Sequence, residues 1–192
     1  MDREIEDLAA VIEAADGSAY VYGSSSGAAL ALAAAAAGVA IEKLVAFEPP
    51  FVVDQSRKQV PETWVEDLEA REPAEAVKYF MTKVIGLPGP FVAMMRLMPA
   101  WKQLKAMAPT LPYDARVVGA NISGRPLDAA QWAGIGSPVL TVYGGKSPAW
   151  MKTAVCSVAD AVPGAECREV PGQTHMITTT AIAPVLTDFF TR

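Results

Sequence analysis

Residues 1–15 carry apolar side chains at helical spacing, with acidic residues between them. The apolar positions are three or four residues apart: Ile5, Leu8, Ala9 and Ile12. This spacing places them on one side of a helix, and Gly17 follows at a position typical of a C-terminal cap. The sequence therefore predicts a one-sided helix at the start of the chain.

The next segment alternates between strand and helix patterns. Residues 19–23 read as a short buried strand, and the alanine-rich residues 27–38 as a tightly packed helix. Residues 43–48 form a second apolar run, which Pro49 and Pro50 end. A strand, helix and strand at this spacing predict a βαβ unit with two parallel strands.

Residues 52–136 show short helical patterns separated by prolines, without a convincing strand. Many flexible or aromatic apolar side chains fall here, which gives an adaptable apolar surface. Two interpretations stay open: ordinary helix packing, or a lid over an apolar substrate pocket. These residues include Trp64, Phe80, Met81, Phe91, Met94, Met95, Met98, Trp101 and Met107.

The strand pattern returns after this insert. Residues 138–145 predict a strand, 149–161 a helix and 166–170 another strand, followed by a loop and a last helix through Phe190. The expected fold class is α/β, with a mostly parallel sheet of about four strands. Residues 1–51 and 137–192 would form the core, and residues 52–136 a helical cap.

Composition supports one folded unit and excludes some partners. Of the 192 residues, 52% are hydrophobic and 19% charged, which argues against disorder. The net charge of -5 and the absence of a Lys/Arg cluster argue against binding to nucleic acid or anionic membranes. The uncharged residues 17–41 contain GSSSG and many alanines, so no membrane span is expected.

Two cysteines, Cys156 and Cys167, are too few for a metal-ligand cluster or a disulfide framework. The start MDREIED lacks the basic and apolar regions of a signal peptide. We therefore expect a reducing, cytoplasmic location.

Gly23 to Gly27 spell G-S-S-S-G, which fits G-x-S-x-G with Ser25 at its centre between a predicted strand and a predicted helix. A serine on such a sharp turn needs small neighbours two residues away, and its hydroxyl projects above the sheet edge. The Ser26 N–H at the helix start can stabilise an oxyanion. The alternative is an ordinary Gly/Ser turn.

The single histidine, His175, favours the catalytic interpretation. It lies in the loop between the last predicted strand and the last helix. A lone histidine is often structural, but this one stands where a general base would follow a nucleophilic serine in chain order.

Together, AYVYGSSSGAALALA, KLVAFEPPF, PVLTVYGG and GQTHM resemble the α/β-hydrolase fold, in the serine esterase/lipase branch with a helical cap. The resemblance implies a nucleophile at Ser25 and a base at His175. The family usually carries its acid after the penultimate strand, where residues 144–148 offer no carboxylate. Some members carry it after the strand that follows the nucleophile strand, and Glu48 stands there. Glu48 would orient His175, unless it is only a solvated strand end.

The resemblance also implies several strands before the nucleophile strand, together with a second oxyanion donor. This chain begins about 18 residues before residue 19. The N-terminal half of the usual sheet is then absent, so the chain is shortened or the remainder comes from elsewhere. An open edge at residues 19–23 and an exposed apolar helix face (Ile5, Leu8, Ile12) predict a homodimer.

The expected function is hydrolysis of small carboxylic esters with apolar acyl groups through an acyl-enzyme, without a metal or other cofactor. The alternative is a catalytically impaired remnant that acts as a binding or scaffold protein. Substrate contacts are expected from Met94, Met98, Trp101, Trp150 and Met176.

Overall fold

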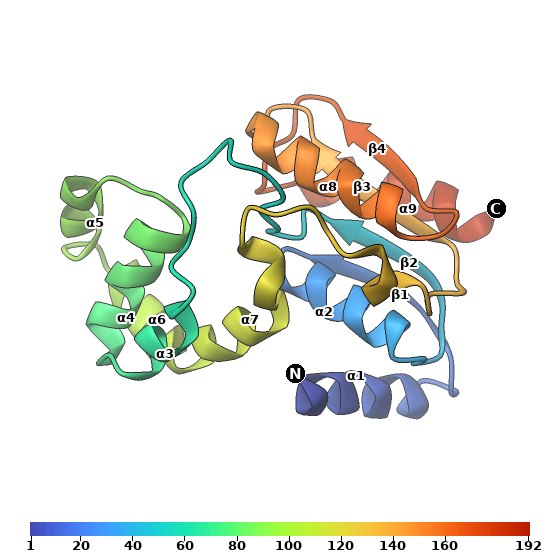
Figure 1. Ribbon diagram of the computed structural model, residues 1–192, viewed down its shortest axis with the longest axis horizontal. Helices are drawn as coiled ribbons and strands as arrows, with labels where there is room; N and C mark the ends of the chain where they lie inside the picture. The colour runs from blue at the N-terminus through green and yellow to red at the C-terminus, as the bar shows by residue number, and fades with distance from the viewer.

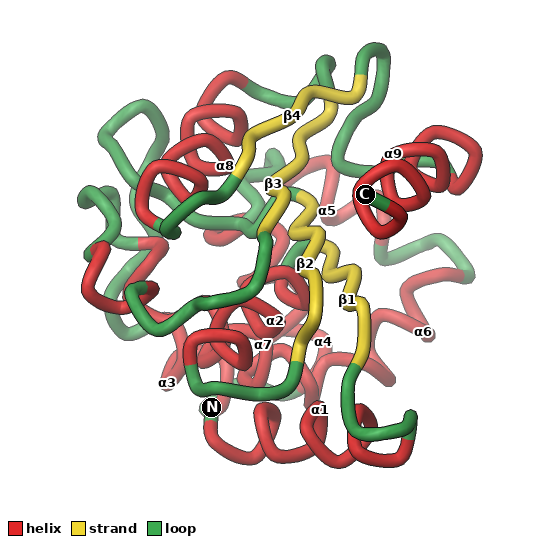
Figure 2. Tube along the Cα trace, turned by 90° about the vertical axis from the view of Figure 1, so that its right-hand side faces the viewer, coloured by secondary structure: helices red, strands yellow, loops and turns green.

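The computed structural model describes residues 1–192 and is built on a four-stranded parallel sheet in the order β1-β2-β3-β4 (Figure 1, Figure 2). Each strand lies within two residues of its predicted position, and the α/β fold class is confirmed. β1 is an edge strand, since it pairs only with β2. The strands are β1 (Ala19–Ser24), β2 (Ile41–Phe47), β3 (Val139–Gly144) and β4 (Glu166–Val170).

Helices cover both faces of the sheet (Figure 2). Alternate residues of β2 enter different cores: Leu44 and Ala46 pack in the larger one with α2 and α8, and Val45 and Phe47 pack in the smaller one with α9. This alternation follows from the two-residue period of a strand. The helices are α2 (Ser26–Ala36), α8 (Ala149–Ala161) and α9 (Thr179–Thr191).

The segment between β2 and β3 contains helices and no strand, and most of it extends to one side of the sheet (Figure 1). α7 packs against α2 and joins the two parts of the chain. The segment contains α3 (Trp64–Glu69), α4 (Pro73–Tyr79), the π-helix η1 (Phe80–Val84), α5 (Gly89–Met95), α6 (Ala100–Met107) and α7 (Leu111–Val118), and the 3-10 turns η2 (Ala108–Thr110), η3 (Gly119–Ile122) and η4 (Ala129–Trp132).

The first helix, α1 (Asp2–Ala14), is covered within its own chain, contrary to the sequence-based expectation. It lies against α2 (Figure 1). Ile12 is buried, and Ile5 and Leu8 are partly buried against the same core. The alanine-rich surface of α2 allows this close packing, so the apolar face of α1 is not free for another chain.

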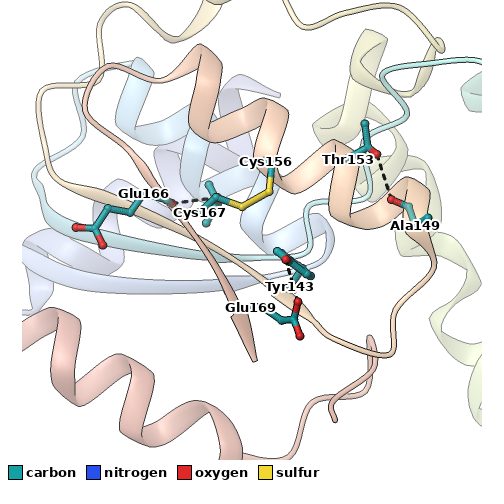
Figure 3. The surroundings of a disulfide bond; sticks show 8 residues. Tyr143, Ala149, Thr153, Cys156, Glu166, Cys167 and Glu169 are labelled. Carbon is teal, nitrogen blue, oxygen red and sulfur yellow. Dashed lines mark hydrogen bonds between the residues drawn. A yellow bond between two sulfur atoms is a disulfide. The ribbon is translucent and has the colours of Figure 1, made fainter. Parts of the chain in front are cut away.

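The two cysteines form a disulfide, which corrects a second expectation. Cys156 on α8 bonds to Cys167 on β4 and ties this helix to the edge strand beneath it (Figure 3). The cysteine count could not reveal this pair, because the sheet topology brings the two positions together. A disulfide of this kind is more typical of an oxidising compartment than of the cytoplasm.

No helix has the length and apolar character needed to span a membrane. No group of three or more His, Cys, Asp and Glu side chains is placed to hold a metal ion.

Candidate active site

The carboxyl ends of the parallel strands bring together residues from distant parts of the sequence. Ser25 follows β1, Glu48 follows β2, and His175 lies in the loop after β4. The Ser25 N–H donates to the Phe47 carbonyl over 2.9 Å, and the Glu48 N–H donates to the Val142 carbonyl over 3.0 Å. This is the edge at which open α/β sheets bind their ligands.

Ser25 occupies a sharp turn between β1 and α2. Its backbone has φ 57° and ψ -126°, an uncommon conformation for a residue with a side chain. The turn lets α2 begin directly after β1. It therefore places the Ser25 side chain at the end of the sheet rather than on one of its faces.

The two glycines of G-S-S-S-G differ in how closely they are packed. A Cβ atom at Gly23 would lie 2.5 Å from the Gly27 carbonyl oxygen and 2.7 Å from the Ala28 Cα, whereas a Cβ at Gly27 would meet nothing within 4 Å. From the sequence, both glycines were expected to have the same steric role. The structure assigns it to Gly23 alone.

This difference predicts opposite results for two matched substitutions. Gly23→Ala should destabilise the fold by about 3 kcal/mol or more, because backbone atoms must move. Gly27→Ala, at the start of a helix, should be neutral or slightly stabilising. Chemical denaturation of both variants tests this. Equal stability of the two would contradict the described packing of the turn.

Glu48 is fully buried and directed at His175. Its Oε2 lies 2.7 Å from His175 Nδ1, and its Oε1 accepts a hydrogen bond of 2.8 Å from the Gly144 N–H. The backbone of Glu48 also has a positive φ of 45°. This turn directs the carboxylate across the strand ends towards β3 and the histidine loop.

The surroundings of Glu48 favour its ionised form. Burial by itself raises the pKa of this carboxyl. Hydrogen bonding to His175 and the Gly144 N–H, with the nearby Ser147 hydroxyl, outweighs burial and holds the pKa below its usual value. The Ser147 hydroxyl is buried and forms no hydrogen bond of standard geometry, so it remains available to the Glu48 carboxylate. An ionised, buried carboxylate is suited to orient an imidazole.

Two contacts position the histidine loop. The Lys146 N–H donates to the Gln173 carbonyl over 2.7 Å, and the His175 ring stacks on Phe47 with 6.3 Å between centroids. The His175 side chain is 42% exposed, so its second nitrogen can be reached by a substrate. The structure forms no hydrogen bond between Ser25 and His175. Such bonds often form only in the substrate complex.

Ser26 is the first residue of α2, and its N–H has no acceptor within that helix. The positive end of the helix dipole lies at the same place. This N–H is therefore available to an oxyanion near Ser25. It is the one oxyanion donor that the sequence analysis named.

The structure scatters the expected substrate contacts. Met94 and Met98 are about half-exposed, at 54% and 52%, and α5 lies at the end of the molecule away from the sheet (Figure 1). Trp101 is buried, and Met176 is 83% exposed next to His175. Trp150 lies at the start of α8 and lines a separate pocket. Periodicity showed which side chains were apolar but not which ones faced the site.

That pocket, of about 450 Å³, contains a group of basic residues. Arg57, Lys58 and Lys83 line it together with Tyr79 and Trp150. We call this space the cationic pocket. Its lining also includes Pro61, Asp67 and Ile85. This basic cluster is not visible in the sequence, because Lys83 is far from Arg57 and Lys58 along the chain.

Comparisons with known proteins agree with this fold. The model of the alpha/beta hydrolase family matches residues 2–186. An alpha/beta hydrolase from Sphaerobacter thermophilus is 46% identical with a TM-score of 0.86; the match covers 98% of this chain and 74% of that one. No curated protein sequence matches the chain significantly.

More distant structures share the fold alone. A meta-cleavage product hydrolase from Pseudomonas fluorescens is 11% identical with a TM-score of 0.59, over 99% of this chain and 71% of that one. NosK from Streptomyces actuosus is 21% identical with a TM-score of 0.57, over 99% of this chain and 76% of that one. The family match and the 46% identical structure decide the classification: this chain belongs to the alpha/beta hydrolase family.

Proposed function

We propose that this chain is a serine hydrolase that cleaves carboxylic esters through an acyl-enzyme intermediate. The observation that carries the proposal is the contact of 2.7 Å between buried Glu48 and His175, at the same sheet edge as the strained Ser25. Family membership supports hydrolysis as the reaction class. The choice of ester rests on the serine nucleophile.

In this mechanism, His175 donates its Nδ1 hydrogen to Glu48, which leaves Nε2 as the basic nitrogen. Nε2 takes the proton of Ser25 as the serine oxygen attacks the ester carbonyl. The imidazolium then gives this proton to the leaving alcohol, and an acyl-serine remains. A water molecule, activated by the same nitrogen, releases the acid and regenerates Ser25.

Glu48 acts through His175 in both halves of the reaction. It fixes the orientation of the ring and stabilises the imidazolium that forms when Ser25 loses its proton. The Ser26 N–H stabilises the negative oxygen of the tetrahedral intermediate. A single donor of this type contributes on the order of 10²- to 10³-fold in rate.

Esters with apolar acyl groups are the proposed substrates, since the exposed apolar side chain of Met176 follows His175 directly. We expect kcat/KM to rise by about fourfold for each CH₂ group that the site buries. A series of p-nitrophenyl esters from acetyl to hexanoyl measures this. Equal values across the series would refute the preference for apolar acyl groups.

The proposal includes a homodimer. The open edge of β1 supports pairing with a second chain. The covered face of α1 removes the other surface that was expected to drive it, and a folded monomer in sedimentation at micromolar concentration would refute the dimer. For the location, the Cys156–Cys167 disulfide favours an oxidising compartment over the cytoplasm that the sequence predicted. Cell fractionation would settle the location.

A further inference from the structure

The cationic pocket lies where the cap meets the core. Arg57 and Lys58 come from the segment that follows Glu48, Tyr79 from α4 and Lys83 from η1. Trp150 comes from the first turn of α8, soon after Gly144, which holds the Glu48 carboxylate. The pocket is thus built on two segments that also position the catalytic acid.

The charges in this pocket are unbalanced. Arg57, Lys58 and Lys83 form no ion pair, whereas most of the other arginines are paired with carboxylates. The one carboxylate in the lining, Asp67, is already bound by Arg71 over 2.8 Å and by the Tyr79 hydroxyl over 2.9 Å. The pocket therefore presents positive charge in a protein whose net charge is -5.

Arg57 is held in place within the pocket. Its guanidinium stacks 4.5 Å from the centroid of the Trp150 ring, and one N–H group donates to the Val84 carbonyl. Burial lowers the pKa of this guanidinium, because an unpaired cation is poorly solvated there. The remaining N–H groups form no other hydrogen bond. A fixed, partly buried guanidinium of this kind suits a carboxylate, which it can bind with two parallel hydrogen bonds.

The other walls indicate an organic ligand rather than a bare ion. Trp150, Ile85 and Pro61 supply apolar surface, and about 450 Å³ is within the range of small-molecule sites. From this lining and charge, we infer that the cationic pocket binds the carboxylate of a small organic acid with an apolar chain.

Binding can be tested without catalysis, by titrating the protein with hexanoate and following the tryptophan fluorescence. Loss of the fluorescence change in Trp150→Phe would show that Trp150 is the tryptophan that responds to binding. We expect saturable binding that weakens with salt, and an affinity at least about tenfold lower in Arg57→Gln and in Lys83→Gln. Lys83 is exposed and forms no hydrogen bond, so its substitution should leave the fold intact. Lys102→Gln, on α6 outside the pocket, is the matched control for loss of one charge.

Three results of the titration would overturn the inference. They are no binding of hexanoate, equal binding of neutral hexanamide, and an unchanged affinity in both pocket variants. Inorganic phosphate that competes as well as hexanoate would show an unselective anion site, which also contradicts an organic-acid pocket.

Discussion

Ser25→Ala should reduce ester hydrolysis by at least about 10³-fold while the protein remains folded. The reason is that only Ser25 lies on the strained turn at the end of β1, where its hydroxyl can attack a bound ester. His175→Ala should cause a loss of the same order, because the serine then has no base. The double variant should be no worse than either single one, since the two residues act as a unit.

The flanking serines provide matched controls for this prediction. Ser24→Ala and Ser26→Ala remove the same hydroxyl from the neighbouring positions, and Ser26 is expected to act through its backbone N–H. Both should keep most of the activity. Steady-state kinetics on p-nitrophenyl butyrate, with circular dichroism for folding, compares these five variants. Full activity in Ser25→Ala protein that is free of contaminating esterase would reject the assignment.

Glu48→Gln is expected to have the second largest effect, with kcat lower by about 10²- to 10⁴-fold and KM little changed. The amide retains the size of the side chain but cannot stabilise the imidazolium. It also presents a different hydrogen-bond partner to His175 Nδ1, which disfavours the required tautomer. Glu62→Gln, at an exposed position without hydrogen bonds, is the matched control and should leave kcat and KM unchanged.

The pH dependence of stability gives this prediction a second readout. The folded-state pKa of Glu48 is lowered, so its ionised form stabilises the native protein at pH values above the unfolded pKa of about 4.3. This contribution is lost as the pH falls through the lower, folded-state pKa. Glu48→Gln should therefore flatten the acid side of the stability profile. An unchanged profile would mean that Glu48 is not held as a charged group.

Local patterns in the sequence predicted much of the fold. The helix at residues 149–161 matches α8, because its apolar residues repeat at the helical period and Pro148 precedes it. The first three strands were found because their apolar runs end at glycine or proline. The serine, its base and the acid were also named, since each follows a strand and parallel strands end at one edge.

Contacts between distant segments could not be read from these patterns. The Cys156–Cys167 disulfide depends on α8 lying against β4. The cationic pocket depends on η1 folding back beside the segment after β2, which brings Lys83 to Arg57. The exposure of Met94 likewise depends on how far α5 extends from the sheet. Such features follow from tertiary packing, which residue spacing does not encode.

Labelling with a fluorophosphonate tests the central claim most directly, since this reagent modifies only an activated serine. Intact-mass and peptide mass spectrometry should show one adduct per chain, located at Ser25, and no adduct in His175→Ala or in protein that was denatured before labelling. Absence of labelling in the folded, unmodified chain, or an adduct at Ser24 or Ser26, would contradict the account and favour a binding protein built on a hydrolase fold.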